Sequence, residues 1–121
     1  YRNFNSKEDI LIAYINTLFD EWKGNLEKNS SLPISSAIGT VFCNFDQHKA
    51  FYSLLNKHHL IYLLKDVILD IMVLKPGLPT GESYAKAFVA YSLYGWIEVW
   101  FERGMQESAE EMKQLFQSQG L

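Results

Sequence analysis

The sequence predicts an all-α fold, a bundle of five to six helices. Apolar residues recur at three- and four-residue spacing along most of the 121 residues, and no stretch alternates apolar and polar residues over a useful strand length. Distinct breaks separate the helical stretches, and the clearest of them is PGLPTG at residues 76–81. A chain of this length forms one domain that can bury a real core.

The first helix is predicted from Ser6 to about Lys23. Ser6 suits the N-cap position, and Asp9, three residues later, adds a carboxylate at the positive end of the helix. One stripe carries the apolar side chains Leu11, Tyr14, Ile15, Leu18 and Trp22. Gly24 and the polar run 25–31 are expected to end this helix.

Three shorter helices are expected to follow. Pro33 suits the first turn of the second helix, which carries apolar residues from Ile34 to Phe45. The third helix should cover Gln47 to Asn56, and residues 57–59 form the joint into a fourth helix over residues 60–74. Only three charged residues lie on that fourth helix, so we expect it to be buried on most sides.

The longest predicted helix runs from about Gly81, capped by Thr80, to Arg103. Glu82 and Lys86 form a favourable pair four residues apart near its start. Residues 87–101 contain a single charge, Glu98, so apolar groups surround the helix. Such a helix needs cover on two sides, and the core of one domain can cover only one of them.

The last predicted helix follows a sharp stop at Gly104, which suits a left-handed backbone. Ser108 and Glu111 match a capping box at its start. Its small apolar face consists of Met112, Leu115 and Phe116.

Composition narrows the function classes. The net charge is −3, the pI is near 5.6 and no cluster of Lys and Arg is present, which argues against nucleic-acid binding by this chain alone. Lys65, Asp66 and Asp70 interrupt the longest apolar run, so no membrane span is expected. The single cysteine and the lack of a recognisable signal peptide favour a cytoplasmic location.

No set of catalytic or metal-binding residues is recognisable, so we expect neither an enzyme nor a cofactor. The three histidines lack the spacing of metal ligands, and Cys43 has no local base and is expected to be a small buried residue. Glu98 and Glu102, one turn apart, are interpreted as a solvated edge or as partners of basic groups on another subunit.

Aromatic residues make up 15% of the chain, a high share. For most of them core packing is the simpler interpretation. Because Tyr and Trp carry a polar tip on an apolar body, some of them would also suit the wall of a small-molecule pocket. The candidate pocket residues lie on different predicted helices and are Phe42, Phe45, Tyr52, Tyr62, Phe88 and Trp96.

The opening stretch YRNFNSKEDIL resembles a known junction. Its pattern, Tyr1, Phe4, Ser6, Lys7, Glu8 and Leu11, is similar to the end of the DNA-binding domain and the start of the next helix in TetR/AcrR-family transcriptional regulators. Residues 48–68 and 88–116 resemble a Firmicutes-type C-terminal domain of that family, with Trp100, Glu102 and Gly104 in its pattern.

This resemblance implies a division of the chain. Residues 1–5 would be the remnant of a helix-turn-helix DNA-binding domain that is otherwise missing, and residues 6–121 would be an effector-binding and dimerisation domain. In the family, the last two long helices pair with those of a second subunit in a four-helix bundle. The interface candidates on this basis are Tyr91, Tyr94, Gly95, Val99, Met112, Leu115 and Phe116.

The function that the resemblance implies is ligand sensing and dimerisation in a TetR-like regulator, a repressor that a small apolar or aromatic effector releases from its DNA operator. In the full-length protein Tyr1 and Lys7 would contact DNA phosphates. Two alternatives stay open. The same fold would respond to a protein partner, or the chain would be a free-standing helical interaction module.

Overall fold

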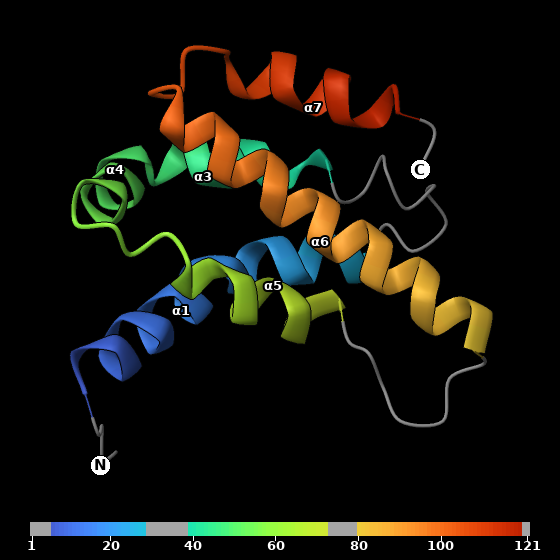
Figure 1. Cartoon of the computed structure of the whole chain (residues 1–121), viewed down its shortest axis with the longest axis horizontal. Helices are drawn as coiled ribbons and strands as arrows, with labels where there is room; N and C mark the ends of the chain where they lie inside the picture. The colour runs from blue at the N-terminus through green and yellow to red at the C-terminus, as the bar shows by residue number, and fades with distance from the viewer. Residues whose placement is uncertain (1–5, 29–38, 73–79, 120–121) are drawn as a thin grey trace.

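The computed structural model describes residues 6–28, 39–72 and 80–119, and over these ranges it contains helices and no strand. The prediction of an all-α fold is confirmed. Figure 1 labels the helices, which are α1 (Lys7–Lys28), α3 (Val41–Gln47), α4 (Lys49–Lys57), α5 (Leu63–Met72), α6 (Thr80–Glu102) and α7 (Ala109–Gln117).

The start of α1 agrees with its prediction, and its end does not. The Ser6 hydroxyl accepts a hydrogen bond from the Asp9 backbone N–H at 3.2 Å, as expected of an N-cap. Gly24 was expected to stop the helix, but α1 continues to Lys28. A helical glycine costs only about 1 kcal/mol, and the buried contacts of Phe19 and Trp22 in the preceding turns outweigh that cost.

In the middle of the chain, the helix boundaries in the described residues differ from the predicted ones. Residues 34–38 of the expected second helix lie outside the described residues, and α3 begins at Val41. The joint predicted at 57–59 begins one residue later, because Lys57 ends α4; His59 lies in the left-handed region at φ 59°. α5 begins at Leu63 rather than at residue 60, because residues 58–62 form the turn that connects α4 to α5.

The long helix and its stop follow the sequence pattern closely. Residues 76–79 of the PGLPTG break lie outside the described residues, and Thr80 is already helical, so the cap predicted there is wrong. The Lys86 Nζ lies 3.6 Å from Glu82 Oε1. Gly104 takes a φ of 73°, which confirms the left-handed stop.

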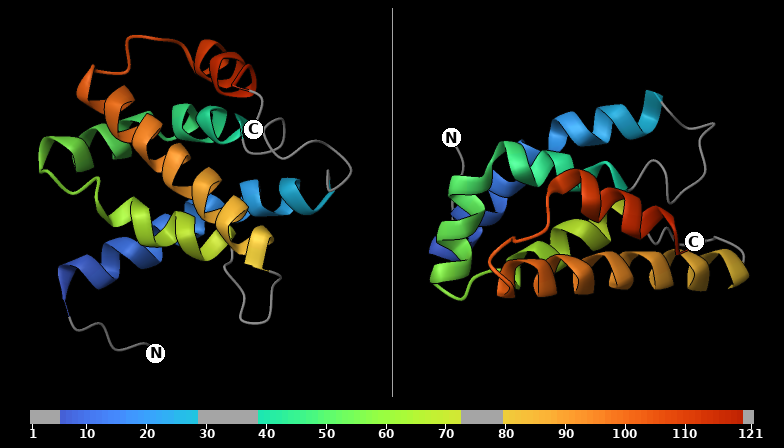
Figure 2. Two further views of the ribbon diagram at one scale, coloured as in Figure 1. Left: turned by 45° about the vertical axis from the view of Figure 1, so that its right-hand side comes forward. Right: turned by 90° about the horizontal axis from the view of Figure 1, so that it is seen from above.

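The helix α5 packs directly against α6, and α1 packs against α5 farther from α6, while α7 is folded back beside α6 (Figures 1 and 2). The contacting pairs include α5 with α6, α4 with α6, α3 with α7 and α1 with α5. Seen from above, α6 lies along one edge and all the other helices lie on one side of it (Figure 2, right). Its outer face therefore has no helix of this chain against it among the described residues.

The core is aromatic and centres on α3. The Phe45 ring lies within 5.9 Å, centroid to centroid, of the rings of Phe19 on α1, Tyr52 on α4 and Phe101 on α6. One turn earlier, Phe42 contacts Trp100 on α6 at 5.5 Å and Phe116 on α7 at 6.0 Å. One short helix thus ties together four others. None of the helices in the described ranges has the length and apolar character that crossing a bilayer requires.

Candidate functional site

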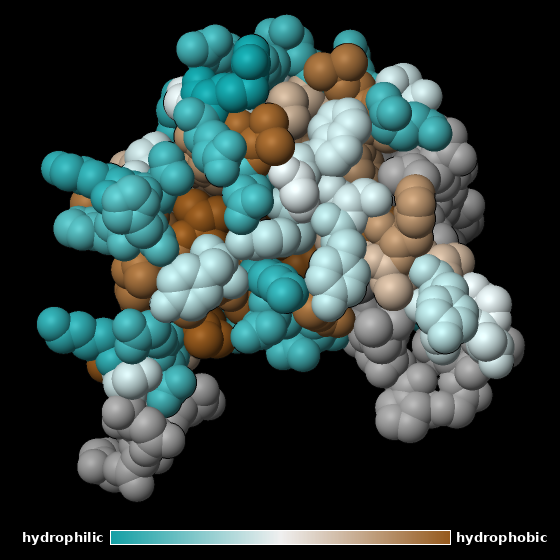
Figure 3. All heavy atoms as spheres, viewed as in Figure 1, coloured by the Kyte–Doolittle hydropathy of each residue, from teal (hydrophilic) through white to brown (hydrophobic). Residues whose placement is uncertain are grey.

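The helix α6 has two apolar faces. The inner face is buried and carries Val89, Ala90, Leu93, Ile97, Trp100 and Phe101. The outer face exposes residues at spacings of three and four, which we call the α6 stripe: Tyr84, Phe88, Tyr91, Gly95 and Val99. The four side chains on the stripe are between 51% and 73% exposed. Pale and brown side chains lie over α6 on this face, with teal groups beside them (Figure 3).

A hollow adjoins the stripe where α7, which packs on α3, folds back beside α6. This α6–α7 groove has a volume of about 510 Å³ and is lined by Gly95, Trp96, Val99, Trp100, Arg103, Glu107, Met112 and Leu115. Its walls are apolar except at one end, where Arg103 and Glu107 lie. An exposed apolar stripe that runs into an apolar groove is typical of a surface that another molecule covers.

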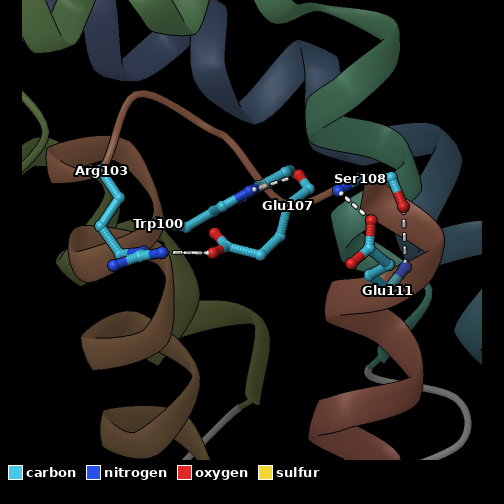
Figure 4. A network of polar contacts seen from close by, with 5 residues as sticks. All are labelled: Trp100, Arg103, Glu107, Ser108 and Glu111. Atoms are coloured by element: carbon cyan, nitrogen blue, oxygen red, sulfur yellow. Dashed lines mark hydrogen bonds and ion pairs between the residues drawn. The ribbon is translucent and has the colours of Figure 1, made fainter.

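The loop between α6 and α7 is held by a polar network (Figure 4). The Trp100 indole N–H donates to the Glu107 carbonyl at 3.0 Å, and Arg103 Nη2 donates to Glu107 Oε2 at 2.7 Å. The hydrogen bond from Arg103 holds the pKa of the Glu107 carboxyl below its ordinary value. Ser108 and Glu111 form the predicted capping box, with bonds of 3.1 and 3.2 Å. This network fixes the angle at which α7 returns to form the groove.

The helix α7 faces both inward and outward. Phe116 is fully buried, and its ring contacts that of Trp96 at 5.3 Å as well as that of Phe42. Met112 is also buried, whereas Leu115 is 48% exposed and lines the groove. The predicted apolar face of α7 is therefore divided between the core and the surface.

The structure places the six candidate pocket residues in three different environments. Phe42, Phe45 and Tyr52 are fully buried in ring-to-ring contacts of the core. Tyr62 and Phe88 are 55% and 61% exposed, and Trp96 lies at the groove. The six side chains do not line one common cavity in the described part of the chain, because Phe88 lies on the outer face of α6.

One of these residues leaves a polar atom unsatisfied. The Tyr52 hydroxyl is buried and has no hydrogen-bond partner among the described residues. Burial, with a smaller effect from Tyr14, raises the pKa of the Tyr52 phenol far above its ordinary value. An unpaired buried hydroxyl of this kind destabilises the folded state.

The interface candidates, like the pocket candidates, are divided between the surface and the core. Four of them, Tyr91, Gly95, Val99 and Leu115, lie on the α6 stripe or at the groove. The buried Met112 also lines the groove, whereas Phe116 lies in the core behind it. The half-buried Tyr94 donates its hydroxyl to Glu98 Oε2 at 3.1 Å. Burial, then this hydrogen bond, then the charge of Glu98 raise the pKa of Tyr94 to about 12.

Charged residues flank the stripe on the α5 side. The Lys65 Nζ lies 5.6 Å from the centre of the Tyr91 ring. Glu98 and Glu102 are both exposed and line a small hollow of about 230 Å³ beside the end of α4 and the turn that precedes α5. Their exposure agrees with the solvated edge expected for them.

Sequence reasoning did not assign Trp100, Arg103, Glu107 or Lys65 to the site. Two signals pointed to the first three: Trp100 follows Trp96 by one turn, and Arg103 and Glu107 stand four residues apart. Nothing in the sequence indicates the contact of Lys65 with Tyr91, since it depends on how α5 packs on α6.

The remaining candidates lie away from this surface. Lys7 is exposed at the start of α1, and Tyr1 lies outside the described residues. Cys43 is only half-buried, not buried as expected, because it faces a shallow hollow between α1 and α3. Within the ranges that the structure describes, no three His, Cys, Asp or Glu side chains gather closely enough to hold a metal ion.

Comparison with known proteins gives one match. A TetR-type family described as a transcriptional regulator C-terminal region matches residues 34–118, more than half of the chain. Searches of curated proteins and of solved structures gave no match. The matched range contains α3 to α7, and with them the whole α6 stripe and the α6–α7 groove. The chain therefore belongs to the TetR family of transcriptional regulators and carries their C-terminal region.

Proposed function

We propose that this C-terminal region forms a homodimer and senses a small effector, and that a DNA-bound repressor releases its operator when the effector binds. The observation that carries the first part is the exposed apolar stripe of α6 beside the α6–α7 groove. Apolar side chains at helical spacing favour burial against another protein surface, and a second copy presents the same surface.

Oligomeric state tests the dimer directly. We expect sedimentation equilibrium of the chain at micromolar concentration to give a dimer, and Val99→Asp to give a folded monomer. Leu54→Asp is the matched control, since Leu54 on α4 is 53% exposed and Val99 is 52% exposed. A folded wild-type monomer at this concentration would contradict the dimer.

The Tyr52 hydroxyl supports the second part of the proposal. An effector with an apolar body and one hydrogen-bond acceptor would enter the aromatic core and satisfy this donor, so binding would relieve the cost of leaving it unpaired. The rings of Phe42 and Phe45 would have to shift to admit it, because both are fully buried.

Such a shift reaches α1 through one contact. Phe45 lies between Tyr52 and Phe19, with ring-to-ring distances of 4.6 and 5.6 Å. Displacement of Phe45 would therefore move α1, which begins at Lys7 and which the family resemblance places next to the DNA-binding unit. An effector acts as a switch only if its affinity differs between the two positions of α1.

Thermal unfolding in the presence of candidate compounds tests the sensor. We expect aromatic ketones or esters to raise the Tm, and hydrocarbons of the same shape to raise it less. Tyr52→Phe should remove the difference between the two classes. If no compound in a broad apolar set raised the Tm, regulation by a protein partner would replace the small effector.

A DNA operator is the second partner in this proposal. Lys7 is exposed at the N-terminus of α1, and in a protein that carries the helix-turn-helix unit it would contact a phosphate together with Tyr1. We propose a cytoplasmic location for this regulator, because its DNA operator would be there. A gel shift of the full-length protein with Lys7→Gln would show weaker binding to all DNA sequences.

A further inference from the structure

We infer that α6 pairs antiparallel with α6 of a second copy around a two-fold axis at Gly95, with Phe88 of each copy in the α6–α7 groove of the other. This inference rests on the proposed dimerisation and adds a register to it. Gly95 lies in the last third of the stripe, one turn before Val99, and a Cβ placed there would meet no atom within 4 Å. The lack of a side chain leaves room for two helix backbones to approach closely.

The shape of the stripe favours an antiparallel pair. Its three aromatic side chains, Tyr84, Phe88 and Tyr91, all precede Gly95, and the groove lies beside α6 from Gly95 to Arg103. An antiparallel pair around Gly95 therefore brings the projecting half of one copy against the hollow half of the other. A parallel pair would bring together the two projecting halves and leave both grooves empty.

The two-fold axis fixes which residues meet. A residue a given number of positions before Gly95 lies beside the residue the same number after it in the other copy, so Tyr91 lies at the level of Val99 and Phe88 at the level of Glu102. Phe88 stands on the same side of the stripe as Val99, toward α7. Its ring therefore enters the end of the groove next to Arg103, one turn beyond Val99.

Charge complementarity supports the same register. Lys65 lies over Tyr91, and Tyr91 lies at the level of Val99 of the other copy, whose neighbours on the α5 side are Glu98 and Glu102. Neither carboxylate has a Lys or Arg partner in the described part of the chain. The pairing brings Lys65 of one copy to these two carboxylates of the other on both sides of the axis.

Disulfide cross-linking tests the axis. In a Cys43→Ser background, we expect Gly95→Cys to form a linked dimer under mild oxidation, because a disulfide needs Cα atoms about 4.4–6.8 Å apart. Val99→Cys should not link, since the two copies of residue 99 lie about 12 Å apart along the helices. Gly24→Cys is the control, as Gly24 is also helical with open space around it.

The outcomes separate this inference from the proposed function. If sedimentation shows a dimer but residue 99 links and residue 95 does not, the register is wrong and dimerisation stands. If sedimentation shows a folded monomer, both are wrong.

Charge reversal tests the pairing of Lys65 independently. Lys65→Glu should weaken the dimer by roughly tenfold in Kd, as expected for two exposed ion pairs turned repulsive. Adding Glu98→Lys and Glu102→Lys to the same chain should restore most of that loss, and the effect should shrink in high salt. A Kd unchanged by Lys65→Glu, or no recovery in the triple variant, would overturn the ion pairs.

Discussion

At the scale of the residue, a few polar side chains determine where the site forms. Glu107 is an example, because its carboxylate holds Arg103 while its carbonyl holds the Trp100 indole, and both contacts fix the loop before α7 (Figure 4). Ser108 then begins the helix. Removing either residue would free the backbone that forms one end of the groove.

The capping box gives the first prediction. Ser108→Ala should lower the free energy of unfolding by about 1 kcal/mol, because the N–H of Glu111 loses its acceptor. Urea denaturation followed by circular dichroism measures the change. Ser108→Asp is the control and should keep most of the stability, since its carboxylate also caps. Equal losses in both variants would contradict the capping role.

Two phenols predict how stability depends on pH. The pKa of Tyr94 is raised to about 12 and that of Tyr52 is raised further, whereas tyrosines of the unfolded chain ionise near pH 10. Above pH 10 the unfolded state therefore binds fewer protons than the folded state, and the free energy of unfolding falls as pH rises. The stabilisation of the folded state by the two protonated phenols is fully present below pH 10.

Denaturation at a series of pH values checks this prediction. The free energy of unfolding should fall between pH 10 and 12, and the fall should be smaller in the double variant Tyr52→Phe, Tyr94→Phe. Tyr84→Phe is the control, because Tyr84 is 73% exposed. The same alkaline slope in all three proteins would contradict a role for these two phenols.

At the scale of the element, a single turn of α7 contributes one side chain to the core and another to the exposed groove. Phe116 has no exposed surface, and the adjacent Leu115 is half exposed at the groove. The sequence pattern grouped both residues with Met112 as one apolar face. Periodicity identifies which residues are apolar and aligned, but it does not say which of them the domain's own core will cover.

Two substitutions on α7 should separate these roles. In the Val99→Asp background, which we expect to be monomeric, Phe116→Ala should cost about 3–5 kcal/mol of unfolding free energy because it leaves a cavity against Phe42 and Trp96. Leu115→Ala should cost less than about 0.5 kcal/mol there, as an exposed change. In the dimer, Leu115→Ala should instead weaken association. Similar losses for both variants in the monomer would contradict this division.

The sequence predicted helix starts and stops well where a local interaction determines them. Ser6, Gly104 and the Ser108–Glu111 box all behave as expected, because caps and left-handed stops depend on residues a few positions apart. The end of α1 was missed because packing beyond the local sequence carries the helix through Gly24. The candidate pocket residues lie apart for a similar reason, since packing against α4 and α5 decides which apolar face of α6 is buried.

At the scale of the whole molecule, the outer surface of α6 is an apolar face that one copy of the chain leaves uncovered in its described part (Figures 2 and 3). A helix that is apolar all round was expected to need cover on two sides, and the structure supplies cover on one. In the proposed dimer, another copy of the chain would supply the second cover. Assembly would then contribute to the stability of the fold.

Concentration dependence tests this link. The Tm of the chain should rise as protein concentration increases, because a dimer is stabilised by mass action. Val99→Asp should lower the Tm and make it independent of concentration. Calorimetry over a hundredfold range of concentration measures both effects. A wild-type Tm that does not move over this range would contradict coupling of folding and assembly.

The position of the tryptophans has a further consequence. Trp96 and Trp100 line the α6–α7 groove, whereas Trp22 is buried near α3, where its indole N–H donates to the Thr40 hydroxyl at 2.9 Å. Indole emission shifts to shorter wavelength when water leaves its surroundings. In the proposed dimer, the fluorescence of the half-buried Trp96 would therefore report on the contact between the two copies, and that of Trp22 would stay constant as an internal reference.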